Sequence, residues 1–197
     1  MNFALVLNAP MLSVAIQEDM IIAADGGYRH VQEKKVFAVI GDFDTLGYLP
    51  SGVNIVIHPA DKDKTDGELA LDFIKENGGT CVTIYGATGG KIEHVLGNVG
   101  LLAYADGIGL KATIKEERES VYFVKDALEI NELVGHKLSI IAFGGEVTFQ
   151  ESKGLKYSLD GLKIFPYSSL GISNEITEGN ASIKVKKGAC IVVISKN

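Results

Sequence analysis

The first half of the chain alternates short, uninterrupted apolar runs with more polar stretches. Apolar runs without alternation are typical of strands that are buried on both faces of a parallel sheet. The runs predict strands at 3–8, 20–24, 37–41, 53–58 and 80–85. Helical periodicity between these strands then favours a doubly wound, mostly parallel α/β domain.

Two helices are predicted within this half, at 65–77 and 93–105. Thr65 and Glu68 have the spacing of a capping box, so we expect them mainly to satisfy free backbone groups where the first helix begins. Gly78 and Gly79 are expected to end that helix. The side chains expected to face the core are Leu69, Ala70, Phe73 and Ile74 in the first helix and Leu96, Val99, Leu101 and Leu102 in the second.

The second half has a different pattern, with short and partly alternating apolar segments separated by Gly, Asn and Asp. This pattern is typical of a small antiparallel β-sandwich. Strands are expected at 120–124, 137–143, 146–150, 155–159, 181–185 and 189–195. We therefore divide the chain into an α/β domain at 1–115 and a β-sandwich domain at 116–197.

Composition narrows the possible partners. With 46% hydrophobic and 22% charged residues, the 197-residue chain has the make-up of a globular protein. A formal net charge of −6 with scattered basic residues argues against a nucleic-acid partner. No apolar run approaches the roughly 20 residues that span a bilayer, and no signal-peptide pattern is seen, so we expect a cytoplasmic protein without a membrane partner. Cys81 and Cys190 lie in strand-like runs without metal-ligand spacing and are interpreted as buried small hydrophobes.

Candidate chemistry follows four consecutive predicted strands, in the segments 24–27, 41–45, 58–66 and 86–91. Ligands of open parallel sheets bind beyond the carboxyl ends of the strands. Asp42 and Asp44 would point the same way in an extended segment, and Asp63 and Asp66 follow the neighbouring strand. Hard oxygen ligands from two loops suit Mg²⁺. For Asp42 and Asp44 alone, a solvated acidic turn would be the better interpretation.

The glycine-rich segment 86–91 is a candidate phosphate-binding loop at a helix start. It is not a Walker A loop, because Ile92 follows Lys91 where Ser or Thr is required. A tight turn explains the glycines equally well. His94 and Asn98 share one face of the following helix, and the residues alone leave their role open.

The order of these motifs resembles that of the thiamin pyrophosphokinases over nearly the whole chain. Each motif is short, but six in the family's order make a specific match. They are A-D-G-G at 24–27, G-D-x-D-[ST] at 41–45, D-x-D-x-T-D-x-E at 61–68, G-x-x-G-G-[RK]-x-[DE]-H at 86–94, G-L-K-Y at 154–157 and S-N at 173–174. The chain departs from the usual family residues at Thr45, Lys91 and Glu93, where Ser, Arg and Asp are common, and Lys cannot reproduce the bidentate contacts of Arg.

The resemblance implies a homodimer with active sites at the subunit interface, ATP with Mg²⁺, and thiamin as acceptor. Its hydroxyl would attack the β-phosphorus, and AMP would leave. By resemblance, the catalytic residues are Asp42, Asp44, Asp66 and Lys91; the metal ligands are Asp42, Asp44, Asp63 and Asp66; ATP is bound by Asp25, Gly26, Gly89, Gly90 and Lys91; and thiamin is bound by Glu93, His94, Asn98, Ser173 and Asn174. The general base is left unassigned.

Two other functions stay open at this point. A pyrophosphokinase for another heteroaromatic alcohol, such as a pterin, would use the same metal and phosphate residues. A nucleotide-binding sensor would bind ATP without turnover, although such a site has less need of so many carboxylates. Ser173 and Asn174 would also suit a simple β-turn.

Overall fold

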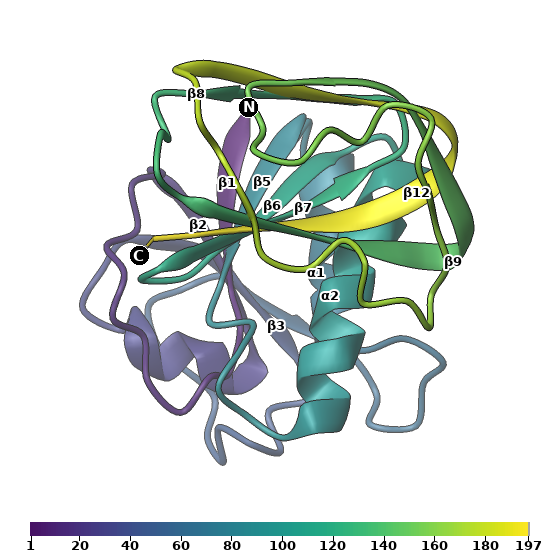
Figure 1. Ribbon diagram of the computed structural model, residues 1–197. Coiled ribbons are helices and arrows are strands. Elements are labelled where there is room, and N and C mark those ends of the chain that lie inside the picture. Colours follow the sequence, from purple (N-terminus) through teal and green to yellow (C-terminus); the bar gives the residue numbers. More distant parts are fainter. Residues whose placement is uncertain (197) are drawn as a thin grey trace. The chain divides into compact units, whose positions relative to one another are not determined.

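The structure, a computed structural model, describes residues 1–196 (Figure 1). It divides into two compact units, the first spanning Met1–Glu117 and the second beginning at Arg118. Within the described residues, no helix is both long and apolar enough to cross a membrane.

A parallel sheet forms the centre of the first unit, with strand order β6-β5-β1-β2-β3-β4. The strands are β1 (Asn2–Val6), β2 (Met20–Ala24), β3 (Val36–Gly41), β4 (Ile55–Ile57), β5 (Cys81–Tyr85) and β6 (Lys111–Lys115). Five of them follow the predicted apolar runs, whereas β6, which begins and ends with a lysine, was not predicted. The chain runs outward from β1 to β4 and then returns to place β5 on the other side of β1. Because these strands are parallel, the loops that follow β2, β3 and β5 lie at the same end of the sheet, beyond the carboxyl ends of the strands.

Three helices accompany the sheet in the described residues: the 3₁₀ helix η1 (Asp25–His30) and the α-helices α1 (Asp66–Glu76) and α2 (Ile92–Gly107). The predicted capping box at α1 is confirmed, because Thr65 Oγ1 accepts from Glu68 N at 3.3 Å and Glu68 Oε2 accepts from Thr65 N at 2.8 Å. In α2, Leu101 and Leu102 are buried as predicted. Leu96 is 66% exposed, so its predicted core position is wrong; burial on this helix begins only at Leu101.

The second unit is antiparallel and is organised by two long strands, β9 (Lys137–Lys153) and β12 (Asn180–Ser195). The first part of β12 pairs with β8 (Ala127–Asn131), and its last part pairs with β7 (Glu119–Val124). Two short strands, β10 (Lys163–Ile164) and β11 (Asn174–Glu175), add to β9.

Glycines were predicted to form turns between the strands at 137–143 and 146–150, and between those at 181–185 and 189–195. They lie instead within the two continuous strands β9 and β12. The pairing of β12 with β9 shifts register between Lys184 and Ala189. Gly188 lies in this stretch with φ +83°, and a Cβ there would come within 2.2 Å of Glu146 O. A residue with a side chain would therefore clash with the neighbouring strand, so the bend requires glycine.

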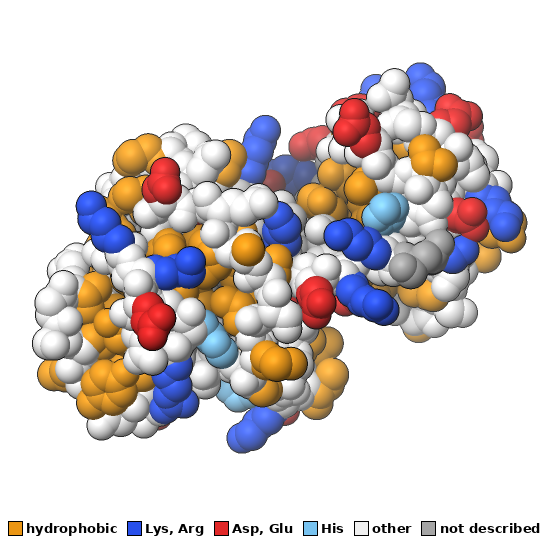
Figure 2. Space-filling model, turned by 90° about the vertical axis from the view of Figure 1, so that its left-hand side faces the viewer, with side chains coloured by type: hydrophobic (Ala, Val, Ile, Leu, Met, Phe, Trp, Pro, Cys, Tyr) orange, Lys and Arg blue, Asp and Glu red, His pale blue; other side chains and the backbone are white. Residues whose placement is uncertain are grey.

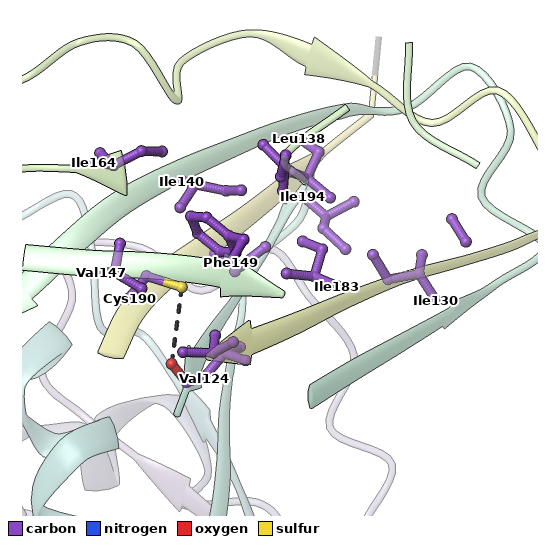
Figure 3. Packing of buried hydrophobic residues seen from close by; sticks show 14 of the residues in the cluster. Val124, Ile130, Leu138, Ile140, Val147, Phe149, Ile164, Ile183, Cys190 and Ile194 are labelled. Carbon is purple, nitrogen blue, oxygen red and sulfur yellow. Dashed lines mark hydrogen bonds between the residues drawn. The ribbon is translucent and has the colours of Figure 1, made fainter. Parts of the chain in front are cut away.

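Apolar side chains from these strands form the core of the second unit (Figure 3). Ile140, Phe149 and Ile183 are almost completely buried there. Cys190 is also buried, its thiol donates to Val124 O at 3.8 Å, and burial raises its pKa to about 12. Cys190 thus packs as the small hydrophobe that the sequence predicted, whereas Cys81 is only half-buried.

The strand predicted at 155–159 is wrong. Only Leu155 makes a bridge, with Ile176. Side chains occupy the backbone groups that a strand would use, because Leu159 N donates to Ser152 Oγ at 2.8 Å and Ser152 N donates to Asp160 Oδ1 at 2.7 Å. Local side-chain bonds of this kind compete with sheet pairing.

Candidate functional site

Three carboxylates converge at one edge of the parallel sheet. Asp25 directly follows β2, Asp42 directly follows β3, and Asp66 is the first residue of α1. One ligand atom from each lies within 4.8 Å of the other two. The carboxyl ends of neighbouring parallel strands place these acids together, as the sequence predicted for Asp42 and Asp66.

Asp25 is buried and positions the loop that follows β3. Its Oδ2 accepts from Thr45 N and its Oδ1 from Leu46 N, both at 3.2 Å. The Arg29 guanidinium donates to the carbonyl oxygens of the same two residues. Gly41 makes the arrangement possible, because a Cβ there would lie 2.9 Å from the Cβ of Asp25. The sequence assigned Asp25 to ATP and missed its place in the acidic group.

Lys62 reaches into the acidic group. Its Nζ lies 2.8 Å from Asp66 Oδ1 and 3.4 Å from Asp42 Oδ2, to which it donates a hydrogen bond. The contact with Asp66 Oδ1 is an ion pair, and no other donor of the described residues reaches this buried oxygen.

Burial and neighbouring charges shift the acids in opposite directions. Burial raises the pKa of Asp66, against the lowering effect of Lys62. The hydrogen bond from Asp44 N, helped by Lys62, lowers the pKa of Asp42. Burial acts to lower the pKa of Lys62, but Asp66 and Asp42 outweigh it and the pKa is raised. The fold therefore disfavours the charged form of Asp66 and favours that of Asp42, and Lys62 stabilises the negative charge of both.

Asp44 and Asp63 lie outside this three-residue group. The spacing argument requires an extended backbone at 42–44. The backbone is not extended there, because Phe43 has φ +65° and buries its ring in the core. Asp44 is exposed and accepts from Thr45 Oγ1 at 3.0 Å. Asp63 is also exposed.

The glycine-rich loop after β5 is fixed at its beginning and exposed at its end. Glu116 Oε1 accepts from Ala87 N at 3.0 Å and from Thr88 N at 3.1 Å, and Asn98 Nδ2 donates to Ala87 O at 2.8 Å. The exposed residues of this region are Gly89, Gly90, Lys91, Ile92, Glu93 and His94. The sequence missed Glu116, for which a carboxylate directly after β6 is the available signal.

In the second unit, Asn174 uses its amide within the protein. Its Oδ1 accepts from Tyr157 N at 3.0 Å and from Glu175 N at 2.8 Å, and its Nδ2 donates to Tyr157 O at 2.7 Å. Asn174 is 5% exposed, whereas Ser173 is exposed with φ +62°. The two C-terminal sequence motifs, 154–157 and 173–174, are therefore joined through one side chain.

Comparisons with known proteins agree across both halves of the chain. Residues 12–114 match the family model for the thiamin pyrophosphokinase catalytic domain, and residues 127–190 match that for its vitamin B1 binding domain. The thiamine pyrophosphokinase of Bacillus subtilis (strain 168) is 30% identical over 192 residues, covering 93% of this chain and 87% of the relative.

Solved structures show the same fold. A Bacillus subtilis thiamine pyrophosphokinase crystal structure matches with a TM-score of 0.85 at 24% identity and covers 100% of each chain. That of Geobacillus thermodenitrificans thiamin pyrophosphokinase matches with a TM-score of 0.81 at 26% identity, covering 100% of this chain and 98% of the other.

Proposed function

The chain belongs to the thiamin pyrophosphokinase family, and from this premise we propose that it transfers the pyrophosphoryl group of ATP to the hydroxyl of thiamin, giving thiamin diphosphate and AMP. The observation that carries the proposal is the convergence of Asp25, Asp42 and Asp66 within the half that matches the catalytic family model. Such a transfer depends on positioning and on charge neutralisation, which an acidic metal-binding group serves.

Magnesium is the cation that we propose for this group. Carboxylate oxygens are its preferred protein ligands, and the buried Asp66 Oδ1 already holds a cation, the Lys62 ammonium at 2.8 Å. Asp25, Asp42 and Asp66 would hold the ion, which when bound would neutralise charge on the triphosphate. Asp44 and Asp63 stay predicted ligands.

Phosphate recognition is proposed for the exposed end of the glycine-rich loop. Gly89 and Gly90 precede α2, whose N-terminus favours anions, and Lys91 adds a positive charge at the same place. Asp25 and Gly26 stay predicted contacts of ATP. The hydrogen bonds at Ala87 and Thr88 would hold the loop so that the backbone N–H groups of Gly89 and Gly90 stay in position for phosphate.

For thiamin, we propose the second unit, with contributions from Glu93, His94 and Asn98. Ser173 is exposed and would contact the substrate directly. Asn174 would act by positioning Tyr157, because its amide is already bonded to the backbone. We further propose that the first part is a doubly wound α/β domain that binds ATP and Mg²⁺ and that the second is a β-sandwich that binds thiamin.

A homodimer with active sites at the subunit interface is proposed as the working assembly. Tyr167 is 86% exposed and stacks on Phe165, and Leu170 is exposed nearby in the sequence. Exposed aromatic and aliphatic side chains of this kind are typical of protein interfaces. Sedimentation of the wild type and of Tyr167→Ser/Leu170→Ser tests this, because we expect a dimer and a weakened dimer respectively.

One assay tests the proposed reaction. The protein is incubated with ATP, Mg²⁺ and thiamin, and AMP and thiamin diphosphate are measured. A parallel incubation contains a hydroxymethylpterin in place of thiamin. AMP formation only with the pterin would show a different acceptor, and ATP binding without AMP formation would show a sensor.

A further inference from the structure

Lys62 contacts two of the three carboxylates that are proposed to hold a cation. Its side chain is 15% exposed, and its ammonium contacts one oxygen each of Asp66 and Asp42, at 2.8 and 3.4 Å. Lys62 comes from the segment just before α1, four residues ahead of Asp66. The three carboxylates repel one another, and this ammonium supplies a compensating charge.

A divalent cation bound by Asp42 and Asp66 would compete with the Lys62 ammonium for the same oxygens. Magnesium binds carboxylate oxygens at about 2.0–2.1 Å. A cation on Asp66 Oδ1 would thus lie close to the Lys62 ammonium at its observed position, and like charges at such short range repel strongly. Lysine has a flexible four-carbon stem, so the ammonium can leave this position without a change in the backbone.

We propose that Lys62 is an exchangeable internal cation of the active site. Its ammonium holds the carboxylates of Asp42 and Asp66 in the free enzyme and transfers to phosphate oxygens of ATP when the nucleotide arrives with its metal ion. This inference rests on the magnesium site of the proposed function.

The exchange makes metal and nucleotide binding interdependent. A metal ion that binds alone displaces Lys62 and leaves its ammonium without an anionic partner. A metal ion that binds with the triphosphate supplies such a partner. Nucleotide should therefore raise the affinity for the metal, and this coupling should depend on the charge of residue 62.

Lys64 provides a matched control from the same segment. Its Nζ lies 2.6 Å from Asp72 Oδ2 and 2.7 Å from the hydroxyl of Tyr104, so its charge is directed at a different carboxylate. Replacing Lys64 by Gln removes the same charge two positions away. Lys62→Arg keeps the charge at residue 62.

The experiment measures binding of Mn²⁺, used as the probe ion, by electron paramagnetic resonance with and without α,β-methylene-ATP, which cannot react. Without nucleotide, we expect Lys62→Gln to bind Mn²⁺ about tenfold more tightly than wild type. Nucleotide should enhance Mn²⁺ binding less in Lys62→Gln than in wild type. Lys62→Arg should behave like wild type, and Lys64→Gln should stay within about twofold of it.

The results separate this inference from the proposed metal site. Wild type that binds no Mn²⁺ with or without nucleotide would overturn the metal site and the role of Lys62 with it. Wild type that binds Mn²⁺ while Lys62→Gln binds it no more tightly would overturn the role of Lys62 alone. If Lys62→Gln does not fold, ¹³C-dimethyl-lysine resonances of wild type, assigned with Lys62→Arg, decide: an unmoved Lys62 signal on adding Mg²⁺ and nucleotide overturns the exchange.

Discussion

Glu116 Oε1 lies 3.0 Å from the backbone nitrogen of Ala87 and accepts its hydrogen bond. The same oxygen accepts from Thr88, so a side chain that follows β6 fixes the loop that follows β5. The carboxylate thereby uses the first backbone donors of the loop and leaves its later part exposed. We regard Glu116 as a positioning residue for the proposed phosphate contacts.

Glu116→Ala should therefore weaken the use of ATP. Hydrogen bonds to a charged group contribute about 1.5–3 kcal/mol, so we expect the KM for ATP to rise about tenfold or more. The KM for thiamin should change little, and steady-state kinetics with each substrate varied measures both. Glu117→Ala is the control, since Glu117 is exposed. Equal ATP kinetics in both variants would remove the positioning role.

Asp66→Asn should abolish turnover while the fold persists. The change preserves side-chain size but removes one of three charges in the acidic group, and loss of one electrostatic stabiliser costs about 10²-fold or more in rate. Because burial raises the pKa of Asp66, its charge is unfavourable in the free fold, and the variant should melt no lower than wild type. Glu76→Gln, an exposed change on the same helix, should keep normal activity. Near-normal rates in Asp66→Asn would exclude the residue from the reaction.

Alkaline pH should reveal the environment of Tyr85. Its hydroxyl donates to Glu18 Oε2 at 2.9 Å, and burial, followed by this bond, raises its pKa from 10.0 to about 12. The neutral form is favoured in the fold, so its stabilising effect is complete below pH 10 and is lost as the pH rises toward 12.

Urea denaturation of wild type and Tyr85→Phe at several pH values tests this effect. Phenylalanine retains the apolar packing but cannot donate to Glu18 or ionise, so the variant should be less stable at neutral pH by about 1–2 kcal/mol. The difference in free energy of unfolding should shrink above pH 10. A difference that stays constant across the alkaline range would show that Tyr85 titrates alike in the folded and unfolded chain.

Features with a local cause could be predicted from the sequence. The buried strands of the first unit and the capping box of Thr65 and Glu68 follow from neighbouring residues alone. The site was partly predictable for a related reason: strand ends of a parallel sheet converge, which placed Asp42 and Asp66 together.

Features that depend on distant partners or on backbone conformation could not be predicted. The positive φ of Phe43 turns the loop, and Asp25 completes the acidic group in place of Asp44. Position 188 in β12 requires glycine because Glu146 O on β9 leaves no room for a Cβ. Glu116 and Asn174 act on backbone groups far away in the sequence.

Asn174 provides the last prediction, because its structural and substrate-binding roles have different consequences. Its buried amide makes bonds to both the nitrogen and the oxygen of Tyr157, and Asn174→Ala would leave these backbone groups without their partner. We expect a loss of about 2–4 kcal/mol in the free energy of unfolding, measured by urea denaturation. Ser173 is exposed, so Ser173→Ala should change the free energy of unfolding by less than about 0.5 kcal/mol. The same variant should raise the KM for thiamin. An Asn174→Ala protein as stable as wild type, with only its KM for thiamin raised, would instead establish Asn174 as a direct substrate ligand.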